Sequence, residues 1–132
     1  MVSRVLTLAL LFAALNGSSA FAQSPCAEVP KDEPFVMVTA PAAGAKVKSG
    51  FAVAGCSRTF ESTVTWTLTV RGGQELAKGT AKGGGVDGAG PLAFTVTAKV
   101  AKPTLAYLEV VEPSASGKGG SSRVIVPVVL TP

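Results

Sequence analysis

The chain has 132 residues, a formal net charge of +4 and no histidine, and these properties exclude several classes of protein. The length suits one domain rather than two. The absence of histidine excludes a serine–histidine–aspartate triad, a cysteine–histidine pair and imidazole metal ligands. Two cysteines are too few for a four-thiolate zinc or iron–sulfur site. Hydrophobic residues make up 47% of the chain, which is typical of a folded protein.

Residues 1–22 have the pattern of a secretory signal peptide. Arg4 supplies the positive charge at the start, and the apolar stretch at residues 5–15 is shorter than the roughly 20 residues of a membrane span. Residues 20–22, Ala-Phe-Ala, form the small–x–small pattern that signal peptidase accepts. We therefore expect cleavage before Gln23, and an uncleaved membrane anchor is the alternative.

Removal of residues 1–22 leaves 110 of the 132 residues and lowers the net charge from +4 to +3, because Arg4 is lost. The remaining basic residues are spread singly and are not clustered with aromatic residues, so nucleic acid is not an expected partner. No lipid-attachment box precedes Cys26, and no second apolar segment of membrane length follows. We expect an exported protein, periplasmic or extracellular, with no lipid anchor and no membrane span after cleavage.

Alternation of apolar and polar residues predicts strands after an extended, proline-containing tail at residues 23–34. The clearest case is residues 62–70, where Trp66 and three aliphatic residues alternate with four threonines. This period of two over eight residues is typical of a strand with one buried face. The expected strands cover residues 35–39, 51–55, 62–70, 75–80, 92–97, 105–111 and 123–130.

Seven short strands with turn residues between them predict an all-β domain at residues 35–132, folded as an antiparallel two-sheet sandwich. A five-stranded barrel is the alternative architecture. We expect Trp66 to lie between the sheets. Pro127 has no N–H to donate to a ladder, so we expect the last strand to face outward at a sheet edge there.

Short motifs along residues 35–130 resemble one known family. They are Val38-x-x-Pro41-x-x-Gly44, Phe60-Glu61, Val64-x-Trp66-x-Leu68, Glu112-x-Ser114 and Val124-x-Val126-Pro127. Their order and spacing resemble the immunoglobulin-like domain of bacterial spore germination, the Gmad type. The resemblance implies an immunoglobulin-like module of the bacterial cell envelope, and it supplies no catalytic residues. The chain departs from the family pattern in carrying Cys56 where a small residue would serve.

Cys26 and Cys56 are the only cysteines of the chain. An even number of cysteines in an exported protein predicts one disulfide. If consecutive strands alternate in direction, the first strand begins at the end of the sandwich where the second strand ends. The tail is long enough to bring Cys26 to Cys56 there. Two free thiols or an intermolecular bridge are the alternatives.

Gly83-x-Gly85-x-x-Gly88 formally matches a dinucleotide-binding fingerprint. That fingerprint requires a helix after it, whereas Pro91 and a strand pattern follow here, so a flexible loop is the preferred interpretation.

The acidic residues show no calcium-loop spacing. A pair of glycosidase carboxylates is not recognisable from sequence, but a small sandwich without an insertion offers little room for a cleft. We expect no enzyme activity, no cofactor and no metal.

Three connections should gather at one end of the sandwich, because alternate connections of an antiparallel sandwich share an end. They are residues 57–62, 82–91 and 112–122. Loops at such an end often bind partners, although mobile glycine-rich spacers are the alternative. The candidate binding residues there are Arg58, Glu61, Lys82, Asp87 and Lys118. Residues 41–50, 71–74 and 101–104 at the opposite end have the composition of compact turns.

Together these patterns predict a monomeric, non-catalytic module that binds an envelope protein or glycan. A secreted protease inhibitor of the β-sandwich type is one alternative, and the glycine-rich loops argue against it. A purely structural envelope protein without a specific ligand is the other.

The exported protein is expected to begin at Gln23 and to carry no lipid, because residues 20–22 form a cleavage site and no lipid-attachment box is present. The intact mass of the protein recovered from the culture or periplasm checks this. A mass that includes residues 1–22, or an acyl group at Cys26, contradicts it.

Overall fold

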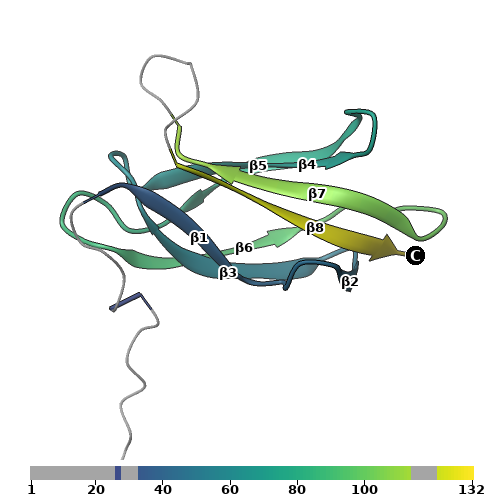
Figure 1. The fold of residues 1–132 in the computed structure, drawn as a ribbon, viewed down its shortest axis with the longest axis horizontal. Helices are drawn as coiled ribbons and strands as arrows, with labels where there is room; N and C mark the ends of the chain where they lie inside the picture. The colour runs from purple at the N-terminus through teal and green to yellow at the C-terminus, as the bar shows by residue number, and fades with distance from the viewer. Residues whose placement is uncertain (1–25, 28–32, 114–121) are drawn as a thin grey trace, which may run out of the picture.

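The computed structural model describes residues 26–27, 33–113 and 122–132, and these residues form eight strands in two facing sheets (Figure 1). The strands are β1 (Phe35–Ala40), β2 (Ala45–Lys48), β3 (Phe51–Arg58), β4 (Thr63–Val70), β5 (Glu75–Lys82), β6 (Gly90–Val96), β7 (Thr104–Val111) and β8 (Arg123–Thr131). The predicted signal peptide and most of the predicted tail lie outside the described residues. Nothing in the described ranges forms a helix that is long and apolar enough to cross a bilayer.

One sheet has three strands in the order β1-β3-β6, and the other has five in the order β2-β8-β7-β4-β5. Neighbouring strands are antiparallel except β2 and β8, which are parallel. The all-β two-sheet sandwich predicted from the alternation is therefore confirmed. The chain passes from the first sheet to the second after β1, at a cis peptide bond between Ala40 and Pro41.

Strand β2 was not predicted, since residues 41–50 have the composition of a turn. The strand is only four residues long and lies between Gly44 and Gly50, which have φ angles of 80° and 86°. It forms because Ala45 to Lys48 pair with Val128 to Thr131 of β8. The strand forms by pairing with residues more than 80 positions away in sequence, so local composition does not predict it.

Pro127 lies on β8, and the expectation of an edge strand there is only half right. Strand β8 is inside its sheet, between β2 and β7. The ladder with β2, however, begins one residue later, at Val128. At Pro127 itself the backbone carbonyl accepts a hydrogen bond of 2.7 Å from the N–H of Gly44. The missing proline N–H therefore falls just before the point where β2 joins the sheet.

Trp66 is 8% exposed and packs between the sheets, as predicted. Its ring stacks on that of Phe94 from β6, with 5.3 Å between the ring centroids and 12° between the planes. The residue opposite Trp66 on β5 is Gly79, where a Cβ atom would lie 2.7 Å from Cζ2 of the indole. The absence of a side chain at Gly79 thus makes room for the indole.

Replacement of Trp66 by alanine is expected to lower the free energy of unfolding by about 3–5 kcal/mol, because it removes the largest side chain of the core and leaves a cavity. Thr67→Ala, one residue along on the other face of β4, is the control and should cost about 1 kcal/mol or less. Chemical denaturation of both variants measures the difference. Equal stabilities of the two variants would show that Trp66 does not anchor the core.

Candidate functional site

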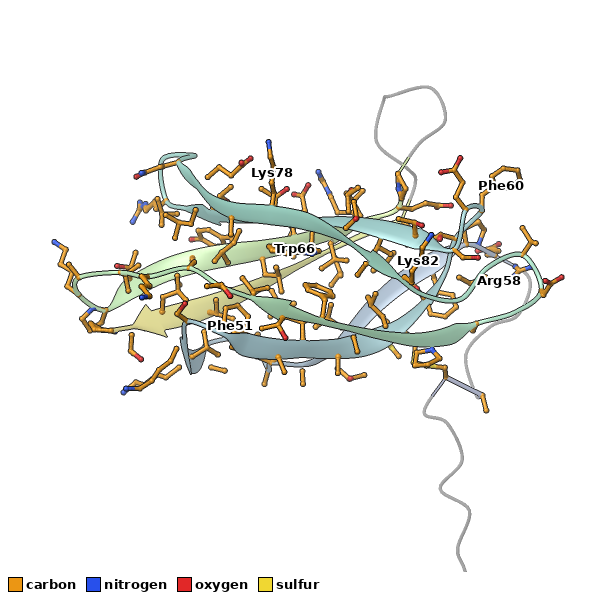
Figure 2. All side chains as sticks on the ribbon, turned by 180° about the vertical axis from the view of Figure 1, so that it is seen from behind. Phe51, Arg58, Phe60, Trp66, Lys78 and Lys82 are labelled. Atoms are coloured by element: carbon orange, nitrogen blue, oxygen red, sulfur yellow. A yellow bond between two sulfur atoms is a disulfide. The ribbon has the colours of Figure 1, made fainter. Side chains whose placement is uncertain are left out.

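Residues from all three predicted connections meet at one end of the sandwich. The N–H of Thr59 donates to the carbonyl of Gly84 at 3.1 Å, and the N–H of Gly83 donates to the carbonyl of Ser62 at 3.0 Å. The N–H of Phe60 donates to Oε1 of Glu112 at 3.3 Å. We call this region the loop end and define it as residues 57–62, 83–89 and 112. Arg58 and Phe60 mark it in Figure 2.

The turn after β3 holds the backbone of Phe60 through several hydrogen bonds. Ser62 N–H donates to the Thr59 carbonyl at 3.2 Å, which closes the turn. The Thr59 side chain is 2% exposed, and its hydroxyl bridges both the N–H and the carbonyl of Thr63 at 3.0 Å. Phe60 itself is 74% exposed (Figure 2). The turn is therefore tightly anchored on its inner side while it presents an aromatic ring to solvent.

The glycines after β5 are packed closely against β3 and the turn that follows it, with no room for side chains at residues 83–85. A Cβ atom on Gly84 would overlap the carbonyl oxygen of Ser57 and the nitrogen of Gly90. One on Gly83 or Gly85 would overlap a serine hydroxyl. Glycine can be needed because another backbone approaches closely, or because the chain must be flexible. The composition of a segment does not distinguish these two roles.

Residues 85–88 form a tight turn that carries Val86 and Asp87 at its tip. The N–H of Gly88 donates to the carbonyl of Gly85 at 3.0 Å. Val86 is 57% exposed, and Asp87 is also exposed. These two neighbours line different pockets, one on each side of the turn.

Arg58 lies between the two pockets and lines both of them. It is the last residue of β3 and is partly buried, and its Nη2 donates to the carbonyl of Val86 at 3.1 Å. The apolar pocket has a volume of about 90 Å³ and is lined by Pro34, Arg58, Thr59, Phe60 and Val86. The charged pocket has a volume of about 310 Å³ and is lined by Cys26, Ala27, Arg58, Asp87, Gly88 and Ala89.

Cys26 and Cys56 form a disulfide with 5.5 Å between their Cα atoms. Cys56 and Arg58 are two residues apart on β3, so both point away from the face that Val53 turns toward the core. The disulfide therefore fixes residues 26–27 against the outside of the three-stranded sheet, where they form one wall of the charged pocket. Both sulfur-bearing residues are buried, at 4% and 0% exposure.

The predicted binding residues are only partly brought together. Arg58 and Asp87 line one pocket. Lys82 lies on β5, where its Nζ donates to Oγ1 of Thr63 at 3.2 Å, and Glu61 is exposed on the Phe60 turn. Lys118 lies outside the described residues. The sequence predicts no metal site anywhere in the chain. Within the described ranges, no group of three His, Cys, Asp or Glu side chains could hold a metal ion.

The sequence reasoning missed Phe60, Val86 and Glu112. Phe60 interrupts a run of polar turn residues, and Val86 is a single aliphatic residue in a glycine-rich stretch. A large apolar residue in such a turn is the signal that could have identified them. The role of Glu112, which is 8% exposed, depends on a contact with Phe60 over 52 residues of sequence, and no local pattern indicates it.

A further pocket of about 370 Å³ lies at the opposite end of the sandwich. It is lined by Lys48, Ser49, Lys99, Val100, Thr131 and Pro132. The compact turns predicted for this end therefore leave a hollow between β2, β8 and the chain after β6. This pocket is the competing location for a ligand.

Comparisons with known proteins match the chain to one family model and to solved structures. The family model described as "Immunoglobulin-like domain of bacterial spore germination" matches residues 35–121. A search of curated proteins finds no match. Among solved structures, the chain is similar to the crystal structure of CopC from Methylosinus trichosporium OB3b, with 16% sequence identity and a TM-score of 0.47. That match covers 76% of this chain and 95% of the other.

Replacement of both Cys26 and Cys56 by serine is expected to lower the free energy of unfolding by about 3–4 kcal/mol, because the bond closes a loop of 30 residues. The sandwich should still form, since neither residue belongs to the core cluster between the sheets. Denaturation curves and far-UV circular dichroism measure the two effects. Thiol titration of the denatured, unreduced protein is the accompanying test, and two reactive thiols per chain would contradict the intramolecular bond.

Proposed function

Because the chain belongs to the family of immunoglobulin-like domains of bacterial spore germination, we propose that it is an exported, non-catalytic module that binds another component of the bacterial cell envelope. The component is a protein or a glycan, and the contact is made by the loop end. The module acts as a monomer without a cofactor.

Export is supported by the disulfide and by the N-terminal pattern. Disulfides persist in oxidising compartments and are rare in the cytosol. The bond between Cys26 and Cys56 therefore fits a periplasmic or extracellular location. Residues 1–22 supply the matching targeting pattern, and the absence of a lipid-attachment box at Cys26 fits a protein without a lipid anchor.

The exposed pair Phe60 and Val86 is the observation that carries the proposal. Both side chains line the apolar pocket, and they are 74% and 57% exposed. Binding energy at interfaces is concentrated in a few apolar and aromatic anchors, and an anchor that is already held in place loses little conformational entropy on binding. The hydrogen bonds around Thr59 and Glu112 hold the backbone of Phe60 in this way. Arg58 lines the same pocket and supplies a charged group beside Phe60.

The lack of histidine excludes a serine–histidine–aspartate triad, and this supports a non-catalytic role. The protease-inhibitor alternative needs a segment that lies extended in the cleft of the protease. Phe60 instead occupies a closed turn, in which Ser62 N–H bonds back to the Thr59 carbonyl. The geometry of the turn therefore favours docking of a folded surface or a polymer over insertion into a protease.

Phe60→Ser is expected to weaken binding to the isolated cell envelope by about tenfold or more, because it removes the central apolar anchor. Leu105→Ser is the matched control, since Leu105 is 42% exposed and lies near the start of β7, at the opposite end of that strand from Glu112. Fluorescently labelled protein, titrated with untreated envelope, with protease-treated envelope and with purified cell-wall glycan, separates a protein partner from a glycan. If binding survives Phe60→Ser but is lost on replacement of Lys48 or Lys99 by alanine, the opposite end is the binding site and the assignment is wrong.

A further inference from the structure

The charged pocket has the dimensions of a small-molecule site and is separate from the Phe60 surface. Its volume of about 310 Å³ is at the lower end of the range for ligand pockets. Its walls come from three parts of the chain: residues 26–27, the end of β3 and the turn that carries Asp87. The inference drawn from it does not depend on the proposed function.

Two opposite charges line this pocket without pairing with each other. Within the described ranges, the ion pairs closer than 4.0 Å are Lys78 with Glu75 and Arg123 with Glu109. Arg58 and Asp87 are therefore separated by more than an ion-pair distance although they border the same cavity. The space between them is available for a ligand that contacts both.

The Arg58 guanidinium has fewer acceptors than it needs. One bond runs from Nη2 to the Val86 carbonyl, while Nε is buried and has no acceptor in the described part of the chain. A buried donor without a partner costs free energy, and a guanidinium is well suited to bind a carboxylate through two parallel bonds. As a residue that lines the pocket, Arg58 is therefore suited to a carboxylate that enters from it.

Asp87 sets the second requirement. An ionised carboxylate only accepts hydrogen bonds, so its complement in a ligand is an ammonium group or another cationic donor. A ligand with a carboxylate alone would be attracted by Arg58 but repelled by Asp87. A ligand with an ammonium alone would be attracted by Asp87 but repelled by Arg58.

We propose that the charged pocket binds a compact zwitterion, with the ligand carboxylate on Arg58 and the ligand ammonium beside Asp87. The chemical class is that of free amino acids. The disulfide completes the site, because the bond to Cys56 holds the wall formed by Cys26 and Ala27 against β3.

Titration of the ¹⁵N-labelled protein with glycine, β-alanine and γ-aminobutyrate tests the proposal. In this series the distance between the ligand's carboxylate and its ammonium increases from one compound to the next. We expect saturable shifts at the amides of Val86, Asp87, Gly88 and Ala89, with dissociation constants on the order of millimolar. Acetate, methylamine, N-acetylglycine and glycine methyl ester each carry a single charge. They should bind about tenfold more weakly or worse than the best zwitterion.

Asp87→Asn and Arg58→Gln should each weaken binding of the best zwitterion by about tenfold or more. Asp87→Asn is the decisive variant, since the Asp87 side chain makes no hydrogen bond or ion pair within the described ranges, whereas Arg58 also supports the Val86 carbonyl. Arg71→Gln, in the exposed turn after β4 at the other end, is the control and should bind as the wild type does. The Cys26→Ser and Cys56→Ser double variant should also lose affinity.

Three results would overturn the proposal. One is the absence of saturable shifts at about 50 mM of any of the zwitterions. Another is binding of acetate or methylamine as tight as that of the zwitterions. The third is full affinity in Asp87→Asn or in the double cysteine variant, which would place the ligand elsewhere. None of these results bears on the loss of envelope binding in Phe60→Ser, so the two proposals fail separately.

Discussion

The close approach of residues 83–85 to the end of β3 is the contact on which the loop end depends. Gly84 forms a bridge with Arg58, and its carbonyl accepts the N–H of Thr59. Any side chain at Gly84 would overlap the backbone of Ser57 and Gly90. Because this contact joins the Phe60 turn to the Asp87 turn, both turns are held relative to the sandwich and to each other. A small domain thereby gains a defined surface from two short, mostly polar connections.

The alternation of residue types predicted most of the sandwich, because it reports which face of a strand is buried. Strand β4 is the clearest example: its four inward residues meet the other sheet, and Trp66 lies where the period of two places it. Strand β2 was not predicted, since it is formed by pairing with β8 and has little burial of its own. Cysteine number and strand direction predicted the Cys26–Cys56 pair that the structure contains.

The candidate site was predictable in its location but less so in its chemistry. Strand direction alone brings the three connections to one end, and it led to Arg58 and Asp87, which share a pocket. Glu61 and Lys82 came from the same reasoning but are not among the residues that line these two pockets, because membership of a loop does not determine which way a side chain points. The exposure of Phe60 and the packing of the glycines depend on contacts between distant segments, such as that of Phe60 with Glu112.

Arg58 connects the two surfaces, and this has a thermodynamic consequence. Its Nη2 donates to the Val86 carbonyl, and Arg58 lines both the apolar pocket and the charged pocket. Val86 and Asp87 are adjacent residues of one turn, so a ligand that displaces or stiffens this turn acts on both surfaces. Coupling between two binding sites is reciprocal: a zwitterion that strengthens envelope binding must itself be bound more tightly when the envelope component is present, by the same factor. Coupling of either sign would require a change in the turn, whereas independent binding would mean that Arg58 and residues 85–88 stay fixed when either ligand arrives.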